Sequence, residues 1–126
     1  MSGFLTVALG GAIGASARHG LSLAMLRVFG PGFPIGTLFA NIIGGLLMGM
    51  LMGWLLRESA EAADSIRLFA GVGILGGFTT FSAFSLEAFR MLDAKSYGLF
   101  FGYVGASVIL SIAAVALGLF IMRSSL

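Results

Sequence analysis

Residues 71–85 read GVGILGGFTTFSAFS and lie inside a long apolar segment of the 126-residue chain. This stretch combines four glycines, two adjacent threonines, two serines and three phenylalanines. A helix surrounded by lipid would not need this mixture, because lipid offers no partner to exposed polar groups. We therefore interpret the stretch as a break in a transmembrane helix. Its backbone groups and phenylalanine edges are expected to face something other than lipid.

The composition indicates an integral membrane protein. Hydrophobic residues make up 59% of the chain and charged residues only 10%, whereas a soluble domain carries about 25% charged residues. The absence of cysteine excludes disulfides and thiolate metal sites. The net charge of +2 is small and dispersed, so we expect no nucleic-acid partner. Because Met1–Phe4 lack the basic region of a signal peptide, the first apolar run is expected to be a retained membrane span.

Four apolar segments follow one another in a single predicted domain, residues 1–126. They cover about residues 4–27, 35–56, 66–92 and 97–122. Continuous apolar runs favour helices, because transmembrane strands would alternate apolar and polar residues. The predicted fold is therefore all-α, with four transmembrane helices. The third helix is expected to be broken in mid-membrane near residues 76–80, and residues 57–67 are expected to form a charged loop.

The basic residues are divided equally between the two predicted sides of the membrane. With four spans, both termini and the 57–67 loop share one side. That side carries Arg57, Arg67 and Arg123, and the other carries Arg27, Arg90 and Lys95. Orientation normally follows the side richer in Lys and Arg. The tie predicts a chain that inserts both ways and pairs as an antiparallel dimer, unless folding or the N-terminus sets the orientation.

Small residues recur every four positions in three of the segments. The rows are Gly10 and Gly14, then Gly45, Gly49 and Gly53, then Gly98 and Gly102. Such rows let helix backbones approach closely in lipid. They predict a tightly packed bundle or dimer.

Arg18 is the only charged residue well inside a predicted span, and Asn41 is an amide within the otherwise uncharged second span. Arg18 is expected to snorkel to the interface, to attract anions at a vestibule, or to anchor carbonyls at the broken helix. Asn41 is expected either to join helices or to point its amide into a pore. Thr37, one turn earlier, extends a polar stripe on the same face.

The fourth segment carries a second row of hydroxyls. Tyr103, Ser107 and Ser111 are spaced by four residues and share one helix face. Serine hydroxyls often bond back to the carbonyl four residues earlier. The alternative is that the row lines a pathway.

The 71–85 stretch itself offers two kinds of ligand. Freed carbonyls at a break can coordinate a cation, and the N-terminus of the second half-helix can face an anion. Phe81 and Phe84 project from one face, and the positive edge of a phenylalanine ring suits an anion. Glu87, at the end of the stripe, is expected to pair with an arginine or to face solvent. No spacing of Ser, His19 and acidic residues resembles a hydrolytic triad, so no enzyme is predicted.

Three motifs carry a resemblance that covers nearly the whole chain. They are GGAIGASAR at residues 10–18, PIGTLFAN at 34–41 and GGFTTFSAFS at 76–85. The chain resembles the Fluc/CrcB family of small bacterial fluoride channels. The resemblance implies a dual-topology homodimer in the bacterial cytoplasmic (inner) membrane, with two pores at its interface. It also implies passive, selective export of cytoplasmic fluoride, which protects the cell from fluoride toxicity.

The resemblance also implies roles for individual residues. The phenylalanine pair of the family matches Phe81 and Phe84, and its pore asparagine matches Asn41. Its polar track corresponds to Thr80, Ser82, Tyr103 and Ser107, to which Ser111 and Thr37 are added from the stripes above. Its vestibule arginine and third-helix glutamate match Arg18 and Glu87. Its structural Na⁺ at the dimer centre implies backbone carbonyl ligands at Gly76 and Thr79.

Two residues depart from the pattern of the family. Ala83 stands between the two phenylalanines where members usually carry Thr or Ser, so the polar track lacks a hydroxyl there. His19 replaces a more usual aromatic residue.

Two other functions compete with this interpretation. A small multidrug transporter would need a membrane-embedded carboxylate early in the chain, and the first two spans contain none. A non-transporting assembly subunit would use its polar residues only to join helices.

Overall fold

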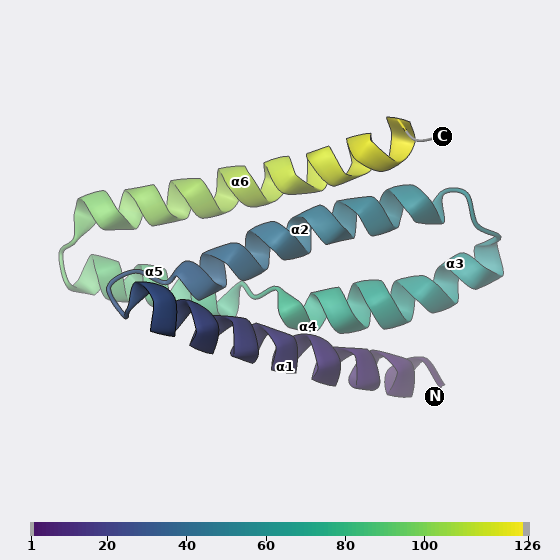
Figure 1. The fold of residues 1–126 in the computed structure, drawn as a ribbon, viewed down its shortest axis with the longest axis horizontal. Helices are drawn as coiled ribbons and strands as arrows, with labels where there is room; N and C mark the ends of the chain where they lie inside the picture. Colours follow the sequence, from purple (N-terminus) through teal and green to yellow (C-terminus); the bar gives the residue numbers. More distant parts are fainter. Residues whose placement is uncertain (1, 125–126) are drawn as a thin grey trace.

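In a computed structural model, which describes residues 2–124, the chain forms an elongated bundle of helices (Figure 1). The helical elements are α1 (Ser2–Phe29), α2 (Ile35–Leu55), α3 (Ala60–Ile66), the π-helix η1 (Arg67–Leu75), α4 (Gly76–Phe78), α5 (Ser82–Asp93) and α6 (Tyr97–Ser124). The elements α3, η1 and α4 follow one another directly, and a short non-helical stretch separates α4 from α5 (Figure 1). The predicted all-α architecture is confirmed over the described residues.

Three of these helical runs are long and apolar enough to cross a membrane. Among residues 2–124 they are Ile35–Leu55, Ala60–Asp93 and Tyr97–Ser124. The first predicted span forms the 28-residue helix α1, but it is not among the three, because serine, threonine, histidine and arginine side chains make it less apolar. The chain is a multi-pass membrane protein.

The bundle places the start of α1 and the end of α6 at the same end of the molecule. Figure 1 shows the N-terminus, the C-terminus and the connection from α2 to α3 at one end of the molecule. The turns that follow α1 and α5 lie at the opposite end, where Gly30 and Lys95 adopt left-handed conformations (φ 77° and 60°). α2 packs against α6 and α1, and α1 packs against η1 and α4.

Glycines set the closest approaches between helices. A Cβ at Gly49 of α2 would overlap the Val115 carbonyl of α6, and one at Gly14 of α1 would overlap the Ile74 carbonyl of η1. Two of the predicted rows therefore pack within one chain. The third row behaves differently, because a Cβ at Gly98 or Gly102 would meet nothing within 4 Å.

Replacing Gly49 by valine is expected to destabilise the bundle by about 1–3 kcal/mol, the usual cost of overpacking. The added side chain would push α2 away from the α6 backbone. Gly20→Val is the matched control, because nothing lies within 4 Å of a Cβ there. Thermal unfolding in detergent, followed by circular dichroism, measures the difference. Equal unfolding temperatures for both variants would contradict this account of the α2–α6 contact.

The segment after α2 corrects one expectation, because the predicted charged loop 57–67 contains the helix α3. Ser59 caps this helix, since its hydroxyl accepts the Ala62 N–H at 3.3 Å. Glu61 lies in the first turn, where a negative charge complements the helix dipole. Serine before an alanine-rich stretch is a helix-start signal, so this helix was readable from the sequence.

The backbone leaves the helical conformation after Phe78. Thr79 is extended (φ −86°, ψ 158°), and helix resumes with α5 at Ser82. Gly76 is itself helical (φ −62°, ψ −37°). The interruption therefore falls at the threonines, and the preceding glycine pair serves another purpose: a Cβ at Gly77 would lie 2.7 Å from the Gly11 carbonyl oxygen of α1.

Candidate functional site

An open cavity of about 430 Å³ lies beside the interruption, between α2, α5 and α6. None of the described residues that line it is ionisable. The polar and aromatic lining residues are Asn41, Thr79, Thr80, Phe81, Phe84, Ser107 and Ser111. The residues predicted to line a fluoride pathway come from three separate stretches of sequence, and several of them meet in this cavity. We call this space the hydroxyl cavity.

Asn41 holds the interruption in its shape. Its Nδ2 donates to the Thr80 carbonyl at 3.0 Å, and its Oδ1 accepts the Thr80 N–H at 2.8 Å. The amide therefore replaces two hydrogen bonds that a continuous helix would make along its own axis. An amide nitrogen carries two hydrogens, so the second N–H is left for the cavity that Asn41 lines. Both roles considered for Asn41 are compatible with this geometry.

The hydroxyls of Thr79 and Thr80 form hydrogen bonds with different helices. The Thr80 hydroxyl accepts the Ala83 N–H at 3.2 Å and so caps α5. The same hydroxyl lies 3.3 Å from that of Ser82. The Thr79 hydroxyl instead donates back to the Leu75 carbonyl at 3.0 Å. Ala83 therefore contributes its backbone to the cap, which needs no side chain at that position.

Arg18 anchors the end of α4. Its Nε donates to the Gly77 carbonyl at 3.2 Å, across 59 residues of sequence. Of the three roles expected for Arg18, this contact supports the anchor at the interrupted helix. His19, its neighbour, is exposed.

The interruption leaves carbonyl groups without their usual helical donors. The Thr80 N–H would bond to the Gly76 carbonyl in a continuous helix, but it donates to Asn41. The Ala83 N–H would bond to the Thr79 carbonyl, but it donates to the Thr80 hydroxyl. Residues 2–124 hold no cluster of three or more His, Cys, Asp or Glu side chains. The carbonyl oxygens of Gly76 and Thr79 are therefore not used by these two N–H groups, and carbonyl oxygen is a ligand type that suits a cation such as Na⁺.

Two serine hydroxyls in the hydroxyl cavity have no hydrogen-bond partner. They belong to Ser107 and Ser111, and both oxygen atoms are buried within the described part of the chain. Neither serine bonds back to its own helix, which was the simpler of the two expectations. Ser85, by contrast, does so through the Phe81 carbonyl at 2.8 Å. A buried hydroxyl without a partner is costly, so these two are suited to a ligand.

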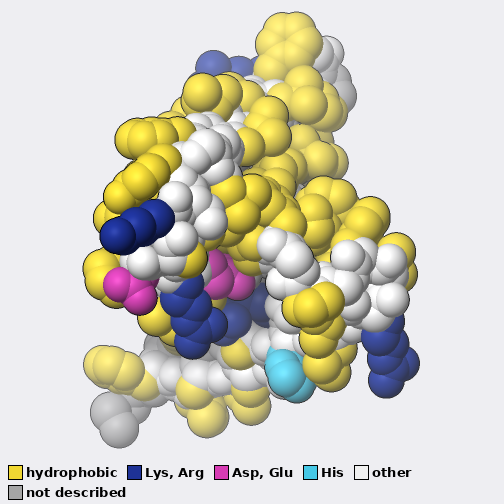
Figure 2. Space-filling view, turned by 90° about the vertical axis from the view of Figure 1, so that its left-hand side faces the viewer, with side chains coloured by type: hydrophobic (Ala, Val, Ile, Leu, Met, Phe, Trp, Pro, Cys, Tyr) yellow, Lys and Arg dark blue, Asp and Glu magenta, His cyan; other side chains and the backbone are white. Residues whose placement is uncertain are grey.

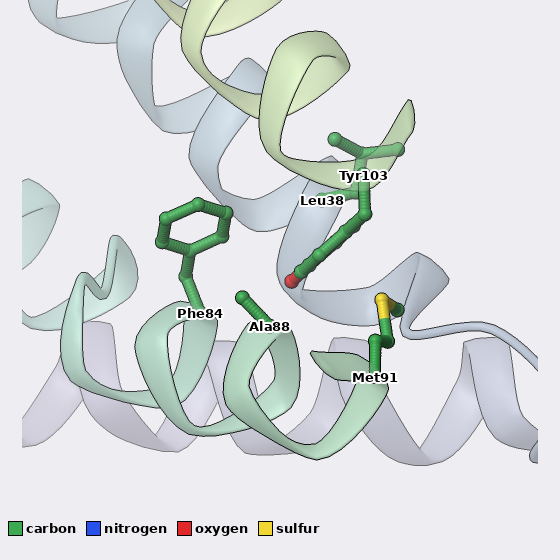
Figure 3. Packing of buried hydrophobic residues seen from close by; sticks show 5 residues of the cluster. All are labelled: Leu38, Phe84, Ala88, Met91 and Tyr103. Carbon is green, nitrogen blue, oxygen red and sulfur yellow. The ribbon is translucent and has the colours of Figure 1, made fainter. Parts of the chain in front are cut away.

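Aromatic rings connect the hydroxyl cavity with the far side of the core. The ring centres of Phe81 and Phe84 lie 5.5 Å apart, those of Phe84 and Tyr103 5.2 Å, and those of Tyr103 and Phe33 5.4 Å. Figure 3 shows Tyr103 extending from α6 toward α5, with Phe84 and Ala88 beside it. Tyr103 is completely buried, whereas Phe81 is 76% exposed.

Glu87 joins Tyr103 and Thr37 in a three-residue network. The Tyr103 hydroxyl donates to Glu87 Oε1 at 3.0 Å, and the Thr37 hydroxyl donates to Oε2 at 3.1 Å. From the sequence, Glu87 was expected to pair with an arginine or to face solvent. Instead, its carboxylate accepts two hydrogen bonds from hydroxyl groups. The structure separates Thr37 and Tyr103 from the hydroxyl cavity, since neither lines it.

The Thr37–Glu87–Tyr103 network borders a second cavity of about 480 Å³ at the end of the bundle that contains the turns. Thr37, Glu87, Arg90 and Phe33 are among its lining residues. Figure 2, which faces this end, shows Lys and Arg side chains around a hollow, with acidic side chains next to them. The aromatic series therefore runs from a neutral cavity to a charged one.

Comparison with known proteins identifies the family. Residues 5–119 match the model of the family described as "CrcB-like protein, Camphor Resistance (CrcB)". The chain belongs to the CrcB family. This membership favours the channel interpretation over the multidrug-transporter alternative that the four apolar segments had raised.

Named relatives in the CrcB family resemble the chain over almost its full length. A protein of Hyphomonas neptunium is 52% identical over 126 aligned positions, which cover 98% of this chain and 97% of the relative. One of Caulobacter vibrioides is 47% identical over 123 positions, with the same coverage. One of Sphingopyxis alaskensis is 48% identical over 124 positions, again covering 98% and 97%. Each relative is named "Fluoride-specific ion channel FluC".

Proposed function

We propose that this protein is a passive, fluoride-selective channel of the bacterial inner membrane that exports cytoplasmic fluoride. The observation that carries the proposal is the hydroxyl cavity, where the buried Ser107 and Ser111 hydroxyls have no partner in the described chain. Unused donors in a cavity without a fixed charge suit a small anion in transit. The names of the relatives make fluoride the first candidate for that anion.

The chemistry of the walls fits fluoride. Fluoride is small and strongly hydrated, so a pore must replace its water with hydrogen-bond donors. The second N–H of Asn41, the serine hydroxyls and the edges of Phe81 and Phe84 supply such donors without a full positive charge. Conduction needs binding that is strong enough for entry and weak enough for exit. Hydrogen fluoride crosses membranes as a neutral acid and ionises inside, so a passive channel lets the trapped anion leave.

The working unit in this proposal is an antiparallel homodimer with two pores at its interface. The hydroxyl cavity is open, and Phe81, one of its walls, is 76% exposed in a single chain. A second copy would supply the missing wall. Outside the spans, equal numbers of Lys and Arg lie at the two ends of the bundle, which allows this copy to insert in the opposite direction.

The proposal includes a structural Na⁺ where two such interruptions meet in mid-membrane. The carbonyls of Gly76 and Thr79 would hold it, because their usual helical donors bond elsewhere. The ion would neutralise the carbonyl dipoles that converge there. Arg18 binds the neighbouring Gly77 carbonyl, which leaves that carbonyl out of the ligand set.

The proposal is tested with purified protein in liposomes. Vesicles loaded with potassium fluoride or potassium chloride are treated with a potassium ionophore, and ion-selective electrodes record efflux. We expect rapid release of fluoride and retention of chloride. Retention of both anions by correctly folded protein would overturn the channel function.

A change in the aromatic wall is expected to slow the channel. Phe81→Ile removes a ring edge from the hydroxyl cavity and should reduce fluoride efflux at least about tenfold, equivalent to about 1.4 kcal/mol in the barrier. Phe101→Ile is the matched control, since Phe101 is 68% exposed but does not line that cavity. If both variants conduct like the unmodified protein, the ring edges have no role in permeation.

A further inference from the structure

A third cavity, of about 430 Å³, lies at the opposite end of the bundle from the turns. It is formed by the last turns of α2, by α3 and by the C-terminal part of α6. Its apolar lining residues are Met52, Leu55, Leu56, Ala60, Ala63 and Leu119, and its charged ones are Asp64, Arg67 and Arg123. None of these residues belongs to the hydroxyl cavity or to the cavity at the turns.

The charged lining residues leave one positive charge in excess. Arg67 Nη2 lies 3.0 Å from Asp64 Oδ1, which uses one of the five N–H donors of that guanidinium. Arg123 has no carboxylate partner among residues 2–124. Glu58 and Glu61 are exposed and do not line the cavity. An apolar floor with two arginines beside it thus complements a ligand with an anionic head and an apolar body.

The cavity lies at the depth of the lipid headgroups. Trp54, the single tryptophan of the chain, is in the last turn of α2 next to two lining residues, and tryptophan marks the membrane–water interface. Arg57 Nη2 donates to the Met122 carbonyl at 2.6 Å and ties the end of α6 to the end of α2. Both of these helices are long and apolar enough to span the membrane, so their ends reach the headgroup layer.

We propose that this cavity is a binding site for an anionic phospholipid such as phosphatidylglycerol. Arg67 and Arg123 bind the headgroup phosphate, and the apolar floor holds the glycerol and the first methylenes of an acyl chain. Basic pockets between transmembrane helices recognise lipid headgroups in this way. A free anion would leave the apolar floor unused, which favours a lipid over inorganic phosphate. The site would attach α3 to α6 without touching the hydroxyl cavity.

Native mass spectrometry of the detergent-purified protein, titrated with phosphatidylglycerol or phosphatidylcholine, tests the proposal. We expect phosphatidylglycerol to bind at least about tenfold more tightly than phosphatidylcholine. Both lipids carry a phosphate, but the choline ammonium cancels its charge and is repelled by the two arginines, whereas phosphatidylglycerol keeps a net negative charge. The double variant Arg67→Gln/Arg123→Gln should remove this preference. Arg27→Gln/Arg90→Gln, at the other end of the bundle, is the charge-matched control and should retain it.

A second variant separates a built site from general attraction. Ala63→Trp fills the cavity and leaves both arginines in place, so it should also lose bound phosphatidylglycerol. Size-exclusion chromatography checks that each variant is folded. The proposal is wrong if phosphatidylcholine binds equally well, if the control pair loses the preference, or if Ala63→Trp keeps it. Displacement by millimolar inorganic phosphate would assign the arginines to a free anion and would likewise overturn the lipid site.

Discussion

Asn41→Asp is expected to reduce fluoride efflux by about 1000-fold. The substitution puts a negative charge in the wall of a neutral cavity. Two like charges 4 Å apart at an effective dielectric constant of 20 repel by about 4 kcal/mol, which corresponds to about three orders of magnitude in rate. The new carboxylate oxygen would also face the Thr80 carbonyl, which lies 3.0 Å from the present amide nitrogen. Liposome efflux with a fluoride electrode measures the effect.

Asn41→Ser separates the charge from the shape of the interruption. Serine is too short to reach both Thr80 backbone groups, so the two bonds at 3.0 and 2.8 Å are lost while the cavity stays neutral. Two neutral hydrogen bonds contribute about 1–3 kcal/mol to stability. If serine stops efflux as completely as aspartate, the backbone geometry limits conduction and the charge does not. Normal efflux through the aspartate variant would remove Asn41 from the pathway.

The helices themselves could be predicted from the sequence because lipid imposes one simple rule. Every backbone group must be satisfied internally, so long uncharged runs such as residues 35–56 have to be helical. Only the details near charged or glycine-rich stretches were missed. The π-helix η1 lies where the α1 backbone approaches closely, as at Gly10, where a Cβ would lie 2.9 Å from Gly73 Cα. No local pattern reports that approach.

The candidate site was predicted residue by residue but not as a set of contacts. Asn41 and Arg18 were each recognised as unusual for a membrane helix, whereas Glu87 was expected only to pair with an arginine or to face solvent. Their partners lie far away in sequence, 39 residues for Asn41 and Thr80 and 59 for Arg18 and Gly77. Several partners are backbone atoms, which are the same in every residue. The sequence alone therefore identifies the polar residues inside the membrane, but their hydrogen-bond partners become known only from the three-dimensional structure.

A substitution in the Thr37–Glu87–Tyr103 network is expected to have a large effect on stability, because two hydroxyls donate hydrogen bonds to the single Glu87 carboxylate. Glu87→Ala is expected to lower the free energy of unfolding by about 3 kcal/mol. It removes two hydrogen bonds to a charged group, each contributing about 1.5–3 kcal/mol, and the wall of the neighbouring cavity allows water to offset part of the loss. Tyr103 is completely buried, so its hydroxyl would be left without an acceptor. Thermal unfolding in detergent provides the measurement.

A double-mutant cycle shows whether the carboxylate and the phenol act together. Tyr103→Phe alone removes one donor and leaves Glu87 bonded to Thr37, so we expect a smaller loss than for Glu87→Ala. In the Glu87→Ala background the same change should cost little or even stabilise, because the phenol no longer has a charged acceptor. The expected coupling energy is about 1–2 kcal/mol. Strict additivity of the two substitutions would mean that the 3.0 Å contact between Tyr103 and Glu87 contributes nothing to the fold.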